Sequence, residues 1–189
     1  MRLLVSEVIA KGIRGRKILD WKKISKIPYK PVEGLPRVKP QVPPHRVLQR
    51  LPESLKTLCE QMASSCLTED GIGLAAPQIG VNLAIICIVD TQQKEIEFFF
   101  NPDWLPVPSN KTKKAAKEGC LSVANQILEV NRFDEIEARW YEYREGDTPE
   151  NSGFFLRQEI LRGQEARVFQ HEVDHLYGRS IVDRHKNEK

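Results

Sequence analysis

The sequence predicts an α+β domain, and three features of its apolar pattern indicate this fold class. Apolar residues recur at helical spacing in Leu51–Cys66 and again in Arg162–Tyr177. Between these segments lie short runs that are either apolar or alternate between apolar and polar residues, as strands do. A helix, several strands and a closing helix are typical of α+β domains. The 189 residues are enough for one such domain with a hydrophobic core.

The first predicted helix follows a proline-rich segment. Six prolines fall within Pro28–His45, which favours an extended arm over a helix. The helix then shows apolar residues three and four positions apart, at Leu51, Leu55, Leu58, Met62 and Cys66. Pro52 suits its first turn.

The predicted strands occupy the middle of the chain. They are Leu83–Val89, Ile96–Phe100, Gln126–Val130 and Glu135–Tyr143. Asn101 and Pro102 are expected to end the second of them. Gly146–Gly153 reads as a polar hairpin or loop, and the polar tail Asp183–Lys189 is expected to fray.

Charge, apolar runs and cysteines limit the function classes. The net charge of +3 comes from interspersed acids and bases, so neither a nucleic acid nor a membrane surface is expected as a partner. The longest apolar run, Leu83–Val89, is too short to span a bilayer. There is no CxxC pair and no secretory signal at the start, so the cysteines are expected to be free thiols in a reducing compartment. They are Cys59, Cys66, Cys87 and Cys120.

The motif His171-Glu172-Val173-Asp174-His175 is the strongest chemical signal. Residues four apart share one helix face, so both imidazoles can bind one metal ion, and Glu172 lies beside them as a general acid/base. A chance match is the competing explanation, and the helical setting argues against it.

A catalytic site of this kind needs a third protein ligand. Only 14 residues follow His175, in a polar tail that offers Asp183, His185 and Glu188 but poor support for a rigid ligand. Upstream, Cys120 is the best candidate because a thiolate binds zinc or iron well. Taken alone, Cys120 is better explained as a small buried apolar residue.

A glycine-rich segment, Gly71–Gln78, supplies a further signal. It is not a phosphate-binding loop, because no Gly-Lys-Ser/Thr follows. It reads either as a helix-to-strand connector or as a strip of backbone beside a cleft, with the Gln78 amide directed inward.

Together these three segments resemble the peptide deformylases, whose motifs are GxGLAAxQ, EGCLS and QHExDH. Here the motifs stand in the same order at Gly71–Gln78, Glu118–Ser122 and Gln170–His175. The resemblance covers about Val47 to Asp183 and includes Asn101-Pro102 and Gly178.

The resemblance implies a fold and a reaction. Antiparallel sheets would pack around the HExxH helix, with the amphipathic helix near the N-terminal side of the core. The reaction would remove the N-formyl group from the formylmethionine of nascent polypeptides and release formate. The cofactor would be one divalent ion, Fe(II) in the cell, with Zn(II), Ni(II) or Co(II) able to occupy the site.

The resemblance also implies roles for individual residues. Cys120, His171 and His175 would hold the metal, and Glu172 would move protons. The Gln78 amide and the Leu121 backbone N–H would stabilise the oxyanion. The residues expected to contact substrate are Ile72, Gly73, Gly119 and Val168.

Three departures from the family pattern define the expected organisation. Residues 1–46 have no counterpart and form a divergent arm, Pro-rich at its end, that could be an extra strand, a partner contact or a flexible tail. Residues 47–183 form the catalytic domain, and 184–189 a polar tail. Ile127 stands where an arginine is frequent, which bears on substrate contacts. No long C-terminal helix is expected, which argues against ribosome docking through one.

Two other functions stay open at this level. One is a non-catalytic metal-binding homologue that binds peptide N-termini, and the other is a different HExxH hydrolase such as a peptidase. The expected location is the cytoplasm of a bacterium or of a phage-infected cell, ahead of an organelle stroma or matrix.

Overall fold

The structure is a computed structural model that describes residues 1–20, 23, 53–147 and 152–186. The predicted arm Pro28–His45 lies outside these residues, as does part of Gly146–Gly153. The helices are α1 (Val5–Ala10), α3 (Glu53–Thr68), the 3-10 helix η1 (Ala76–Ile79), α4 (Gly163–Leu176) and α5 (Ile181–Lys186). The strands are β1 (Arg2–Leu4), β2 (Gly73–Ala75), β3 (Ile85–Asp90), β4 (Glu95–Pro106), β5 (Lys113–Cys120), β6 (Val123–Phe133), β7 (Glu135–Arg144) and β8 (Gly153–Arg162).

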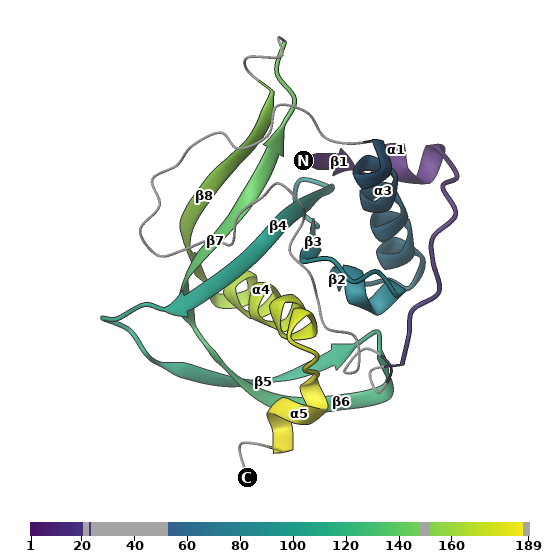
Figure 1. The fold of residues 1–189 in the computed structure, drawn as a ribbon. Coiled ribbons are helices and arrows are strands. Elements are labelled where there is room, and N and C mark those ends of the chain that lie inside the picture. Colours follow the sequence, from purple (N-terminus) through teal and green to yellow (C-terminus); the bar gives the residue numbers. More distant parts are fainter. Residues whose placement is uncertain (21–22, 24–52, 148–151, 187–189) are drawn as a thin grey trace.

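The strands form two antiparallel sheets, which confirms the predicted α+β class. In the described residues the larger sheet has the order β2-β3-β4-β7-β8, with β1 pairing on β4, and β5 and β6 form a separate hairpin. Figure 1 shows α4 lying between the larger sheet and this hairpin. The HExxH helix is therefore enclosed by both sheets, as the family resemblance implied.

Side-chain alternation explains why the two long helices cover opposite faces of the larger sheet. Ile85, Phe98 and Phe100 share a buried cluster with the α3 residues. Ile86 and Phe99, whose side chains point the other way, share a second cluster with the α4 residues. The sheet is thus buried on both faces at strands β3 and β4, and α4 packs against one of these faces.

The N-terminal residues are an extra strand followed by a segment that runs along α3. Arg2–Leu4 pairs antiparallel with Glu95–Glu97. Further along, the backbone N–H of Arg16 donates to Ser65 Oγ at 2.7 Å, and that of Leu19 donates to the Gln78 carbonyl at 2.8 Å. The segment therefore reaches η1, next to the glycine-rich turn.

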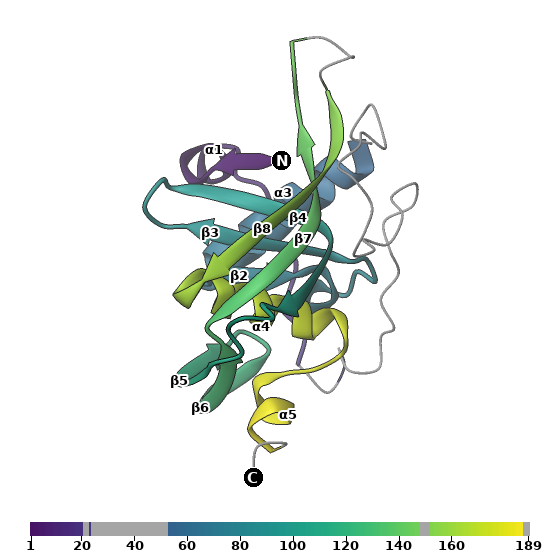
Figure 2. The ribbon, with the colours of Figure 1, turned by 90° about the vertical axis from the view of Figure 1, so that its left-hand side faces the viewer.

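Two sequence-based boundaries are wrong. Strand β4 does not end at Asn101-Pro102 but continues to Pro106, because a register shift between Phe100 and Asp103 absorbs the proline that cannot donate to the ladder. The expected fraying from Asp183 is also wrong for its described part, since Asp183 lies in α5 and its carboxylate accepts the backbone N–H of Ser180 at 2.8 Å. Figure 2 shows α5 beside the β5–β6 hairpin.

All four cysteines are free, and three of them are buried small residues, as predicted. Cys59 and Cys66 lie in α3, and Cys87 lies in β3. Among the described helices none is both long and apolar enough to cross a membrane.

Candidate metal centre

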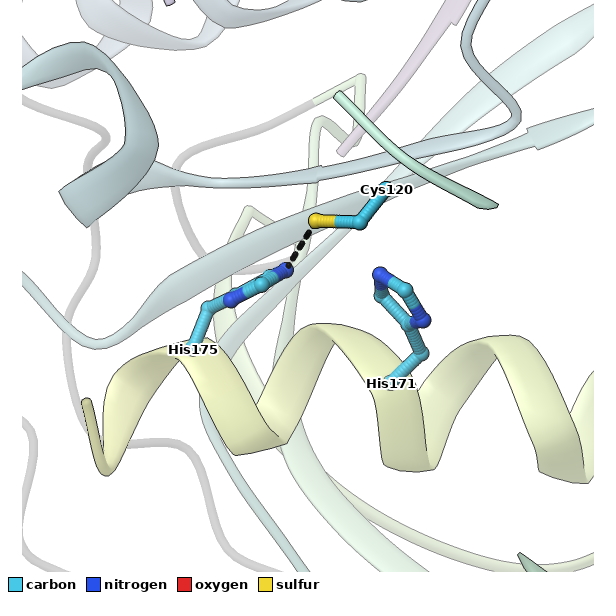
Figure 3. Close-up of side chains that lie close together, drawn as sticks. All are labelled: Cys120, His171 and His175. Atoms are coloured by element: carbon cyan, nitrogen blue, oxygen red, sulfur yellow. Dashed lines mark hydrogen bonds between the residues drawn. The ribbon is translucent and has the colours of Figure 1, made fainter. Parts of the chain in front are cut away.

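Three potential metal ligands, carried by helix α4 and strand β5, lie close together. His171 and His175 lie one turn apart on the helix, and Cys120 ends β5 opposite them (Figure 3). Their ligand atoms all lie within 4.8 Å of one another, and Cys120 Sγ is 3.3 Å from His175 Nε2. Tetrahedral ligands at 2.0–2.3 Å from an ion lie roughly 3.5 Å apart, so the donor set fits a divalent metal.

The β5–β6 hairpin fixes Cys120 in this position. A register shift between Glu118 and Cys120 turns the end of β5, and Cys120 pairs with Val123 across the two-residue turn of Leu121 and Ser122. Bulges of this kind redirect a side chain and are frequent beside active sites. The sequence predicted Cys120 as a ligand but not strand β5, which carries it.

The protonation states of the imidazoles suit metal binding. His171 Nδ1 lies 2.9 Å from Glu118 Oε2, so its Nε2 is the nitrogen directed at the other ligands. Burial lowers the pKa of His175 to about 3, which keeps that ring neutral. Burial raises the pKa of the Cys120 thiol to about 12, so its thiolate form requires a cation beside it.

Glu172 is a buried carboxyl group, one oxygen of which has no hydrogen-bond partner among the described residues. It is 4% exposed, and its Oε2 accepts no hydrogen bond from the described residues. Burial raises its pKa well above the ordinary value. A buried polar atom of this kind calls for a partner, and a group with a raised pKa can exchange protons near neutral pH.

Gln78 is held at the same site from the other side. Its Oε1 accepts the Ala75 backbone N–H at 2.7 Å, and its Nε2 donates to Ser122 Oγ at 3.1 Å. These two bonds fix the amide and leave a second N–H on Nε2 for another acceptor. Gln78 is only 1% exposed, which agrees with the expectation that its amide is directed inward.

A cluster of buried ion pairs behind His171 was missed by reasoning from the sequence. Glu118 accepts bonds from Arg132 Nε at 2.7 Å and from Arg167 Nη1 at 2.6 Å, in addition to facing His171. Burial favours a higher value, but His171 and Arg132 hold the pKa of Glu118 at about 2. In the sequence, Glu118 stands two residues before Cys120. This spacing indicates a neighbour on the same strand but does not reveal the partners of Glu118.

A cavity of about 880 Å³ opens beside these groups. Residues of the Gly71–Gly73 segment, of the β5–β6 hairpin and of α4 line it, and Gln78, His171 and Glu172 are among the lining residues. The four residues expected to contact substrate and Leu121 line it as well: Ile72, Gly73, Gly119, Leu121 and Val168. Ile127 stands at its rim with 71% of its surface exposed.

Comparison with known proteins identifies the family of this arrangement. The family model described as polypeptide deformylase matches residues 36–189. A peptide deformylase of Thermotoga neapolitana is 36% identical over 137 residues, which are 72% of this chain and 76% of the relative. One from Orientia tsutsugamushi strain Ikeda is 36% identical over 143 residues, covering 69% and 73% of the two chains.

Solved structures agree with the sequence matches. A peptide deformylase from Synechococcus elongatus, crystallised with actinonin, superposes with a TM-score of 0.69 at 27% identity, covering 89% of this chain and 78% of the other. A probable peptide deformylase from Synechococcus phage S-SSM7 gives a TM-score of 0.68 at 27% identity, covering 90% and 99%.

Proposed function

The chain belongs to the polypeptide deformylase family of metal-dependent hydrolases, and from this premise we propose how its own residues remove the N-formyl group of formylmethionine and release formate. One observation carries the proposal. Three potential ligands have atoms within 4.8 Å of one another, and two of them, Cys120 and His171, line one cavity together with Glu172, whose buried Oε2 has no hydrogen-bond partner among the described residues. Neither the non-catalytic homologue nor a peptidase is favoured.

Cys120, His171 and His175 are proposed to hold the ion. When bound, a divalent metal supplies a Lewis acid that activates water and polarises the formyl oxygen. Iron and zinc both accept one thiolate and two imidazoles. We propose Fe(II) as the ion in the cell, with Zn(II), Ni(II) and Co(II) as substitutes.

Glu172 is proposed to move the proton. Its carboxylate accepts a proton from the attacking water and then donates it to the leaving amine, so one group serves as base and acid. The raised pKa favours the second half of this cycle, because it stabilises the protonated carboxyl that donates to the amine. The second N–H of Gln78 and the Leu121 backbone N–H are proposed to donate to the developing oxyanion.

The cavity walls are proposed to receive formylmethionine. Gly73 would present its backbone to the peptide, and Ile72, Gly119 and Val168 would enclose the methionine side chain. The neighbouring Ile127 offers an apolar rim to the residues that follow.

The remaining proposals concern the domain organisation, the cellular location and the ribosome. We propose residues 47–183 as the catalytic domain, 1–46 as a divergent arm and 184–189 as a polar tail, the first three residues of which complete α5. Bacterial relatives support action in the cytoplasm of a bacterium or of a phage-infected cell. Ribosome contact stays a prediction that does not depend on a long C-terminal helix.

Product analysis tests the proposed function. Protein purified anaerobically with its metal is incubated with formyl-Met-Ala-Ser, and formate, free amine and peptide fragments are quantified. We expect formate and Met-Ala-Ser in equal amounts with the Met–Ala bond intact. Glu172→Gln should keep the metal while kcat falls about 10²- to 10⁴-fold. Peptide fragments without formate would indicate a peptidase, and bound metal without any product would indicate a non-catalytic homologue.

A further inference from the structure

A chain of buried charges connects the terminal helix α5 to the metal centre. It begins at Arg184 in α5 and passes through Asp174 of α4 and Arg132 of β6. It continues to Glu118 of β5 and ends at His171. Asp174, Arg132 and Glu118 have side chains exposed by only 3%, 3% and 7%. The links join the β5–β6 hairpin to helices α4 and α5, which lie in a distant part of the sequence.

Each link has the geometry of a charge-assisted hydrogen bond. Arg184 Nε donates to Asp174 Oδ2 at 2.8 Å, and Arg184 Nη2 bonds the other oxygen of the same carboxylate. Arg132 Nη1 donates to Asp174 Oδ2 at 2.8 Å. The other side of the Arg132 guanidinium holds Glu118 through two bonds of 2.7 and 2.9 Å. Both arginines thus form two-bonded contacts, which fix orientation as well as distance.

The carboxylates of Asp174 and Glu118 share the Arg132 guanidinium. Because Arg184 also bonds Asp174, Asp174 depends less on Arg132. With Arg184 in place, Asp174 receives two bonds from α5 and needs one from Arg132. Without Arg184, the buried Asp174 carboxylate would rely on Arg132 alone, since a buried charge without partners is costly. Arg132 would then shift toward Asp174 and away from Glu118. Glu118 is the residue that orients the His171 ring.

We propose that Arg184 is a positioning residue for the metal ligand His171, acting through Asp174, Arg132 and Glu118. This inference rests on the metal site of the proposed function. Outer partners of metal-bound histidines fix ring orientation, and their loss costs roughly 10- to 100-fold in metal affinity. Arg184 lies further out, so a smaller effect is expected.

Helix α5 has other attachments, so replacing Arg184 should not detach it. His185 Nδ1 lies 2.9 Å from the Glu129 carbonyl oxygen of β6, and Asp183 caps the start of α5 by accepting the N–H and the hydroxyl of Ser180. Ile181 is buried in a cluster with Val123 and Val130 of the hairpin. The effect of Arg184 on the metal can therefore be measured on a folded protein.

The test is a Co(II) titration of the apoprotein followed by absorption. The d–d bands report ligand geometry, and the thiolate band reports Cys120. Arg184→Met should raise the Kd for Co(II) about 3- to 10-fold, below the range for direct partners, and shift the d–d bands. Arg184→Lys, which keeps the charge, should restore part of the affinity. The control is Arg2→Met, which removes the ion pairs of the exposed Arg2 with Glu95 and Glu97 on β1 and β4, outside the four linked elements.

A double variant tests the route. If the effect passes through Asp174, Arg184→Met should change the Kd for Co(II) little when Asp174→Asn is already present. A wild-type Kd and spectrum in Arg184→Met, with only a lower melting temperature, would overturn the proposal and leave Arg184 a purely structural residue. Failure of the proposed function is separate, because it would appear as Co(II)-loaded wild-type protein that releases no formate.

Discussion

At the residue scale, Gly73 is what allows Glu172 to lie beside the metal ligands. A Cβ at position 73 would stand 2.5 Å from Glu172 Oε1 and 2.9 Å from its carboxyl carbon, closer than real contacts permit. Because Glu172 is buried, it cannot yield without leaving its place. The glycine is required by close approach rather than by a turn.

Gly73→Ala should therefore displace the Glu172 carboxyl while leaving the metal in place. A misplacement of about 1 Å can cost about 10²-fold in rate, so kcat for formate release should fall by about that factor. Metal analysis of the same sample should show unchanged occupancy. In a Glu172→Gln background the added Gly73→Ala should cost little more. A single Gly73→Ala variant with near wild-type kcat would contradict this account.

Residues within a motif could be predicted from sequence, whereas partners across the fold could not. His171 and His175 share a helix face by their spacing, and Cys120 followed once a third ligand was needed. The pairing of Glu118 with Arg132 depends on the β5–β6 register, and that of Asp174 with Arg184 on how α5 returns to α4. Neither contact leaves a periodic trace in the sequence.

At the element scale, α4 is placed by its apolar face. Phe169 is fully buried and packs edge-on against Phe99, with ring centroids 5.4 Å apart, and it also contacts Trp140. The following two turns of the same helix carry His171 and His175. Packing on one face of α4 therefore sets the height of the ligands above the sheet.

Phe169→Ala should lower the free energy of unfolding by about 3–5 kcal/mol, the usual cost of removing a buried aromatic ring. Urea unfolding at fixed metal concentration measures this change. Leu105→Ala is the matched control, because Leu105 is 47% exposed and its loss should stay within about 0.5 kcal/mol. Equal, small effects for both variants would show that this face does not anchor α4.

Helices and strands whose apolar residues recur with a clear period could be predicted from the sequence, whereas elements without such a period could not. The helices α3 and α4 and the strands β3, β6 and β7 follow apolar patterns in the sequence. Strand β5, with the sequence KKAAKEGC, has no alternating apolar face and forms because β6 pairs with it. Strand β4 passes Pro102 because the register shift makes room for it.

At the scale of the whole molecule, a bound ion would cross-link helix α4 and the β5–β6 hairpin. The histidines belong to α4, and Cys120 belongs to the separate β5–β6 hairpin. Binding to this preformed folded site should stabilise the native state, because the unfolded chain does not hold the three ligands together.

Removing the metal should therefore lower the melting temperature. At free metal 100-fold above Kd the stabilisation is about 2.7 kcal/mol, or roughly 5–10 °C for a chain of this size. Calorimetry before and after chelation measures the shift, and metal added back should reverse it. In Cys120→Ala the shift should shrink sharply, and a full shift in that variant would place the ion elsewhere.

The most direct test of the account is formate release measured against metal occupancy in one titration. Anaerobic apoprotein receives increasing Fe(II) or Co(II), and each sample is assayed with formyl-Met-Ala-Ser while its bound metal is counted. The account predicts that turnover rises in proportion to bound metal and levels off at one ion per chain. Full occupancy without formate, or formate release that persists after the metal is stripped, would contradict it.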